Sequence, residues 1–336
     1  MTAATGLVYV AYHRLAGRPN VIVDGSPAEG TTLTLTHWPR YRAPAGLARD
    51  LSAQMAFAYL DAGAGLHGPA AAVSNNHFDQ DGLAGLFALA CPEAAQARRA
   101  VLLGLAAAGD FATYTSRAAA RMSMVCAAYA DPARSPLRLA GDDDERCEQL
   151  YTELLGRLPE LCDHPGRFRA LWGEEDAALT RSETLITSGR VTVREYPDVD
   201  LAVIDVPENA SLPGGHRFAH LWYPGVHPMA IANATGRFAV LIRQGRRYRF
   251  CYRYETWVQY RSRRPRARRD LRPLATALGE LEPAGVTWSA LPSGALEPVL
   301  EPADGAESRI APDQLLELVH AHLARSPADW NPYPAS

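Results

Sequence analysis

The strongest constraint on the fold is an alternation of strand-like and helix-like segments near the start of the chain. Residues 19–25 (PNVIVDG) and 31–39 (TTLTLTHWP) are short, rich in β-branched residues and separated by a Gly/Pro/Ser turn, which predicts two strands. Residues 46–63 have apolar side chains at helical spacing, and residues 68–76 (GPAAAVSNN) predict a further strand. This order predicts an α/β fold with a mostly parallel sheet, whose ligands gather at the carboxyl ends of the strands.

The pattern changes twice further along the chain. From Pro92 to Thr187 every segment shows apolar spacing of three and four, which predicts a helical middle segment. The period then becomes two, and Gln244-Gly245 is typical of a hairpin turn. These changes favour a smaller α+β domain at the C-terminus. The expected divisions are an α/β domain with a helical extension (1–187), an α+β domain (188–328) and a poorly ordered tail (329–336).

Composition excludes several classes of protein. The sequence contains no lysine, so all 34 basic residues are arginine. Phosphate-loop nucleotidases, protein kinases and Schiff-base enzymes need a lysine amine and are therefore excluded. The net charge of -3 and the pI near 6.4 give no overall attraction for nucleic acid or for an anionic membrane. The five cysteines are widely separated, with no C-x-x-C pair, and are expected to be buried thiols.

The chain shows no signal for membrane insertion or export. Its first residues lack a basic leader, and no apolar run approaches the roughly 18 to 20 residues that a membrane-spanning helix needs. We therefore expect a cytoplasmic protein with no membrane partner. The sequence does not predict an oligomeric state.

The end of the strand at residues 68–76 carries a group of potential metal ligands. His77, Asp79 and Asp81 stand at alternate positions, so their side chains converge if the chain stays extended. An imidazole and two carboxylates that close favour a divalent cation among them. Gly82 then allows a tight turn into the following helix. The alternative is a solvated loop in which Asp79 or Asp81 caps that helix.

The segment NNHFDQDGLAG, residues 75–85, resembles the first motif of the DHH-type phosphoesterases. The resemblance implies that His77, Asp79 and Asp81 bind one or two manganese or magnesium ions, and that a metal-activated water hydrolyses a phosphate ester or anhydride. The Asp-His-His motif that names the family is absent, because the chain has no consecutive histidines. The segments SNNHFDQDG, THWP and YRYETWV also resemble bacterial proteins of unassigned function, a likeness that implies no activity.

A further metal ligand is expected outside the first motif. Asp110 is the preferred candidate, because the segment GDFATYTSRAAAR places a carboxylate and hydroxyls together at what resembles the start of a helix. A helix N-cap is the alternative role for Asp110. Asp205, which follows a strand-like run, is a second candidate. Asp163-His164 lies at the end of a helical run and favours a C-terminal cap.

Other polar residues are candidates for contact with the substrate. His37 ends a strand of the same predicted sheet and is the candidate catalytic acid or phosphate donor, a role that a C-terminal histidine could take instead. Asn75 and Asn76 are candidate substrate-binding residues beside the motif. His220 and His227 lie in a Gly/Pro/His-rich segment that resembles the Gly-Gly-His substrate loop of the DHH-associated domain; a packed connection is the alternative.

Residues 261–272 form a dense arginine block and provide an alternative function. With the aromatic residues that precede it, the block could hold a nucleic-acid backbone and stack bases, although a solvated loop before a helix is also consistent with it. A metal-dependent enzyme with a non-phosphorus substrate is a second alternative. The preferred function remains a metal-dependent phosphate hydrolase, with a small phosphorylated molecule or a short oligonucleotide as its partner.

Overall fold

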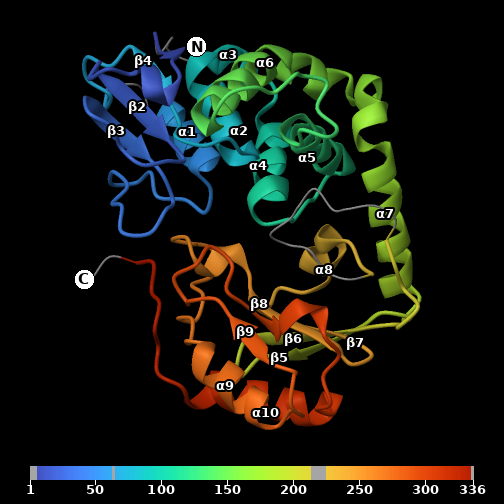
Figure 1. Ribbon diagram of the computed structural model, residues 1–336. Helices are drawn as coiled ribbons and strands as arrows, with labels where there is room; N and C mark the ends of the chain where they lie inside the picture. Colours follow the sequence, from blue (N-terminus) through green and yellow to red (C-terminus); the bar gives the residue numbers. More distant parts are fainter. Residues whose placement is uncertain (1–5, 63–64, 213–224, 334–336) are drawn as a thin grey trace. The chain divides into compact units, whose positions relative to one another are not determined.

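The computed structural model describes residues 6–62, 65–212 and 225–333, and the chain divides into two compact units (Figure 1). The first unit contains the described residues up to Asp176 together with Tyr260–Ser262. The second contains Ala177–Gln259 and the described residues from Arg263 onwards. No helix in the described ranges has both the length and the apolar character that crossing a membrane requires.

The first unit is built on a parallel four-stranded sheet. Its strands are β1 (Val8–Tyr9), β2 (Asn20–Val23), β3 (Thr31–Leu35) and β4 (Ala72–Ser74), in the order β1-β4-β2-β3. Because β2, β3 and β4 are parallel neighbours, the residues that follow them meet at one edge of the sheet. The predicted α/β fold is confirmed.

Helices cover this sheet and extend from it. Helices α1 (Ser52–Asp61) and α2 (Gln80–Ala90) contact the strands, and α2 also packs against α1 and α4 (Figure 1). Gln80 to Leu89 are all buried, which makes α2 the central helix of the unit. The predicted helical middle segment consists of α3 (Pro92–Gln96), α4 (Arg99–Asp110), α5 (Arg117–Ala130), α6 (Asp143–Asp163) and α7 (Arg169–Thr187).

The second unit has a mixed six-stranded sheet in the order β5-β6-β7-β8-β10-β9, with only β6 and β7 parallel. The predicted hairpin turn at Gln244-Gly245 joins β7 to β8. Buried side chains of α9 and α10 pack with those of the sheet in one apolar core, and the predicted α+β character is confirmed. The elements are β5 (Thr192–Tyr196), β6 (Leu201–Val206), α8 (Pro228–Ala234), β7 (Ala239–Gln244), β8 (Arg247–Tyr252), α9 (Arg272–Glu280), β9 (Trp288–Ala290), β10 (Val299–Pro302) and α10 (Pro312–Arg325).

The units divide inside α7, between Asp176 and Ala177, and not at its end as the sequence predicted. The physical reason is that the C-terminal half of α7 packs within the second unit, where the hydroxyl of Ser182 accepts a hydrogen bond of 2.9 Å from the backbone of His227.

The prediction of a poorly ordered tail is wrong for residues 329 and 330. The backbone of Arg268 donates to the carbonyl of Trp330 at 3.2 Å and accepts from the amide of Asp329 at 2.9 Å. The carboxylate of Asp329 accepts a further bond of 2.5 Å from the hydroxyl of Ser293. These backbone and side-chain bonds hold the segment against the second unit.

Candidate metal centre

Four carboxylates and two imidazoles converge at the carboxyl edge of the parallel sheet. They follow the ends of β2, β3 and β4, begin α2 and end α4. Five of them were singled out from the sequence. The sixth, Asp24, was missed, although an aspartate directly after the buried strand NVIV is the signal that could have found it. The six residues are Asp24, His37, His77, Asp79, Asp81 and Asp110.

Asp24 lies at the middle of this cluster and faces both histidines. Its Oδ1 is 3.3 Å from Nε2 of His37, and its Oδ2 is 3.6 Å from Nε2 of His77. Oδ1 also accepts a hydrogen bond of 2.7 Å from the hydroxyl of Ser52. Oδ2 is buried and accepts no hydrogen bond from any described residue. A buried carboxylate oxygen without a donor is costly, so this atom marks the cluster as a candidate cation site.

The first possible ion site is formed by Asp24, His37 and Asp81, and all three side chains are buried. Nδ1 of His37 lies 2.5 Å from the carbonyl oxygen of Asp50. Because a carbonyl only accepts, Nδ1 must carry the proton, and Nε2 is the nitrogen that faces the carboxylates. Nε2 is 3.9 Å from Oδ2 of Asp81 and 3.4 Å from Oδ2 of Asp110.

The second possible ion site is formed by Asp24, His77 and Asp79. Nε2 of His77 is 3.0 Å from Oδ2 of Asp79, and these side chains are 34% and 24% exposed. The ring of Trp38 lies 5.2 Å from that of His77. The second site is therefore the accessible half of the cluster, whereas the first is enclosed.

The two aspartates of the motif also cap helices: Asp79 caps α2, as the alternative interpretation expected, whereas Asp81 caps α1, which that interpretation did not name. Oδ1 of Asp79 accepts from the amide of Gly82 at 2.7 Å, at the start of α2. The carboxylate of Asp81 accepts from the amides of Ser52 and Ala53 at 2.7 and 2.8 Å, at the start of α1. An ionised carboxylate has about four lone-pair directions, so these bonds orient the two groups without exhausting them. Capping and metal binding are compatible here.

Gly82 serves close packing and not the tight turn expected from the sequence, because it lies inside α2. A Cβ atom at this position would lie 2.3 Å from Nδ2 of Asn75 and 2.6 Å from the hydroxyl of Tyr151. The absence of a side chain lets these two groups approach the start of the helix.

The close approach of these acids to one another shifts their pKa values. Burial, followed by the charge of Asp79, raises the pKa of Asp24 well above its usual value. Burial and the charge of Asp24 raise the pKa of Asp81 to about 8. Burial lowers the pKa of His77, but the adjacent Asp79 outweighs it and brings the value to about 9. The pKa of Asp79 is lowered, because His77 outweighs the opposing effect of burial. A bound cation would relieve this repulsion.

The candidate substrate residues beside the motif have different surroundings. Asn75 is buried, and its Nδ2 donates to the hydroxyl of Tyr151 at 3.0 Å, which gives it a structural contact instead of an exposed face. Asn76 is half-buried, and its Oδ1 accepts from the amide of Ser26 at 3.0 Å. Asp110 ends α4 and does not begin a helix, so the predicted surroundings are wrong although the carboxylate lies beside His37.

The remaining described candidates have other contacts. His220 lies outside the described residues. His227 belongs to the second unit, where its buried Nδ1 accepts from the amide of Met229 at 3.1 Å and caps α8, so the structure gives no support to a substrate contact. Asp205 pairs with Arg243 at 2.6 Å. His164 is the C-cap of α6, in agreement with the expected capping role.

Three arginines of the block have partners within the second unit. Arg268 is fully buried and donates to the carbonyls of Ser293 and Leu296 at 2.8 and 2.9 Å. Arg263 pairs with Asp200 at 2.9 Å, and Arg272 pairs with its neighbour Asp270. These contacts account for three of its arginines without nucleic acid.

The fold and this cluster define an α/β protein with a candidate metal centre at a strand edge. Residues 5–334 match the model of the Family of unknown function (DUF6687), and the chain belongs to that family. No curated protein and no solved structure matches the chain.

Proposed function

We propose that the chain is a metal-dependent hydrolase of a phosphate ester or anhydride, similar in its centre to the DHH-type phosphoesterases. The observation that carries the proposal is the position of Asp24, whose two oxygens face two histidines at 3.3 and 3.6 Å. Asp24 belongs to both triads, so it could contribute a ligand to each, and two-ion centres are common in phosphoryl-transfer enzymes.

The residues present fit a divalent ion. In each triad, one ligand atom from each residue lies within 4.8 Å of the others, so the three side chains could hold one ion between them. Carboxylates suit magnesium and manganese, and imidazole suits the later transition metals. The mixed set supports manganese before magnesium.

The residues of the two triads have different expected roles. His37, with Nδ1 held by a carbonyl, is better placed as a ligand through Nε2 than as the catalytic acid that the sequence suggested. His77 and Asp79 form the exposed half, so substrate approaches there, beside the amide of Asn76. A bound divalent ion would lower the pKa of its water and supply hydroxide near neutral pH. Phosphorus remains the preferred target because of the resemblance in residues 75–85.

Metal content and hydrolysis test the proposal together. Purified protein is analysed for metals, titrated with Mn²⁺ by calorimetry, and assayed with a phosphodiester, a phosphomonoester and pyrophosphate. We expect Mn²⁺ binding and hydrolysis that both disappear in D79N and persist in D163N, a matched variant whose carboxylate pairs with Arg98 on the surface. Binding without any phosphate hydrolysis would favour a non-phosphorus substrate, and no binding at all would reject the centre.

A further inference from the structure

We infer that Asp50 is a positioning residue for His37: its carbonyl holds the ring, and its carboxylate ties this part of the chain to residues 260–262. The inference concerns the orientation of His37 and rests on the proposed function only where metal affinity is concerned. Asp50 does not contact the carboxylates of the cluster in any described interaction, so it acts through His37.

The first step is the contact between Asp50 and the ring. The carbonyl oxygen of Asp50 lies 2.5 Å from Nδ1 of His37, which fixes the proton on Nδ1 and turns Nε2 toward Asp24 and Asp110. A carbonyl that accepts from the second nitrogen of a metal-binding histidine sets both its tautomer and its direction. The orientation of His37 therefore depends on where the backbone of Asp50 lies.

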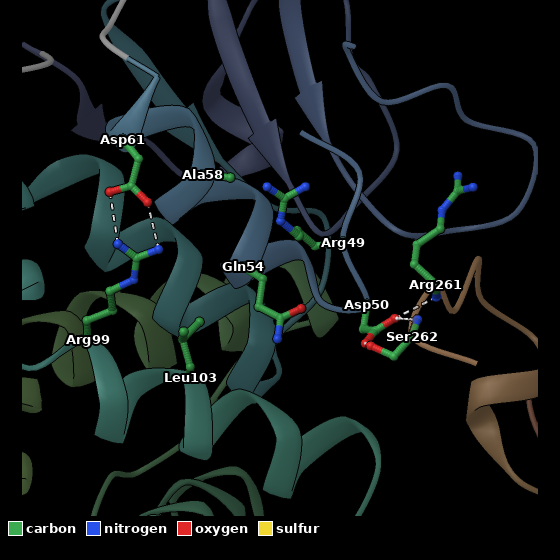
Figure 2. A pocket seen from close by; sticks show the side chains of 9 residues that line it. All are labelled: Arg49, Asp50, Gln54, Ala58, Asp61, Arg99, Leu103, Arg261 and Ser262. Atoms are coloured by element: carbon green, nitrogen blue, oxygen red, sulfur yellow. Dashed lines mark hydrogen bonds and ion pairs between the residues drawn. The ribbon is translucent and has the colours of Figure 1, made fainter. Parts of the chain in front are cut away.

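The second step is what holds that backbone. Asp50 lies in an irregular segment between β3 and α1, where no strand or helix fixes the carbonyl. Its Oδ1 accepts from the amides of Arg261 and Ser262 at 2.5 and 2.8 Å, and its Oδ2 accepts from the hydroxyl of Ser262 (Figure 2). One carboxylate thus receives three donors from a segment more than 200 residues away in the sequence.

The third step is a second contact from the same segment. The ring of Tyr260 lies 5.3 Å from that of Phe111 in an edge-on arrangement, and Phe111 lies 6.2 Å from the ring of His37. Residues 260–262 belong to the first unit although their neighbours on both sides belong to the second. The segment therefore supports His37 from two directions, through Asp50 and through Phe111.

The test compares D50A, D50N and D61A. Asp61 is the matched control because it lines the same cavity of about 320 Å³ but pairs with Arg99 at 2.7 Å, with no described contact to His37 (Figure 2). In metal-free protein, the Nδ1–H proton of His37 is followed by NMR. We expect a protected resonance in the wild type and D61A, a signal lost to exchange in D50A, and intermediate protection in D50N, whose amide oxygen still accepts.

The second readout is the Kd for Mn²⁺, which we expect to be about 10- to 100-fold weaker in D50A and unchanged in D61A. If the wild type binds no Mn²⁺ but D50A still loses the protected proton, the metal proposal fails and the positioning role stands. An unprotected wild-type proton, or a D50A variant that retains both the proton and the affinity, overturns the inference. If D50A does not fold, S262A and Y260L replace it in the same measurements. If both of these variants keep the protected Nδ1–H proton of His37 and the wild-type Kd for Mn²⁺, the inference is likewise overturned.

Discussion

The two units bury charge in opposite ways. In the second unit, Arg268 is fully buried, yet its guanidinium donates to three carbonyls and to the hydroxyl of Thr256. Arg253 and Glu255 form a further buried pair in this unit at 2.5 Å. In the first unit, Asp24 is equally buried, but its Oδ2 has no hydrogen-bond donor among the described residues.

This difference in hydrogen bonding distinguishes a charge that serves the fold from a candidate binding site. The sequence shows a dense run of arginines, but Arg268, which is buried, has its hydrogen-bond acceptors within the protein. In the cluster at the strand edge, the buried Oδ2 of Asp24 has no hydrogen-bond donor among the described residues. A buried polar atom without a partner is costly, so it distinguishes a candidate site better than charge density does.

The largest effect is expected from a substitution of Asp24, the buried acid of this comparison. D24N keeps the shape of the side chain but removes the charge that faces both histidines, so we expect Mn²⁺-dependent hydrolysis to fall about 10³-fold, which corresponds to several kcal/mol of lost stabilisation. Without metal, the variant should be more stable than the wild type because a buried carboxylate has gone. Thermal unfolding with EDTA checks this; lower stability would mean that Asp24 serves the fold alone.

The next effect concerns the satisfied charge. R268A removes the donor to three backbone carbonyls, and we expect it to cost about 3 kcal/mol of unfolding free energy while leaving Mn²⁺ affinity unchanged. Urea denaturation measures the change. R264A is the control, because this exposed side chain lies over the ring of Tyr333 and should cost less than about 1 kcal/mol. Equal effects in the two variants would contradict the assigned difference.

A smaller effect is expected in the pH dependence of the protein's stability. The pKa values of Asp81 and His77 are raised to about 8 and about 9, so the folded, metal-free protein binds more protons than the unfolded chain between pH 5 and 9. Its stability must therefore fall as pH rises, by at least about 1 kcal/mol, the equivalent of one pKa unit. Urea denaturation across this range tests the slope, which saturating Mn²⁺ should flatten. A slope that is the same with and without Mn²⁺ counts against the centre.

The smallest expected effect tests the nucleic-acid alternative. Because several arginines of the 261–272 block have partners within the protein, oligonucleotide binding should be weak, with a shallow dependence on salt. Neutralising the exposed Arg264 and Arg266 should change the affinity less than about twofold. A steep salt dependence that disappears in this double variant would instead support the arginine block as a binding surface.

The sequence predicted the fold where periodicity and turn signals agree. The strands before Asp24 and His37, the strand before the motif and the hairpin at Gln244-Gly245 all appear as expected. The division inside α7 was missed because a continuous helical pattern carries no sign of which unit each half contacts. The packing of residues 329 and 330 was missed because their backbone partner, Arg268, lies far away in the sequence.

Part of the candidate centre was predictable, because local sequence patterns mark the ends of the strands. The motif at residues 77–81 marks three candidate ligands, but the chain does not stay extended there. Asp79 caps α2 and Asp81 lies inside it, so His77 and Asp79 belong to one triad and Asp81 to the other, with His37. Asp24 had a signal that was overlooked. The contacts of Asp50 had no signal in the sequence, because its hydrogen bonds to Arg261 and Ser262 depend on a segment more than 200 residues away.

The sequence by itself determined which polar groups stand at the ends of parallel strands, because strand direction and side-chain alternation follow from local pattern. Only the tertiary structure decided which of the buried charged groups find hydrogen-bond partners among the described residues and which do not. That outcome depends on distances between segments remote in the sequence, and it is what separates the buried Arg268 from the buried Asp24.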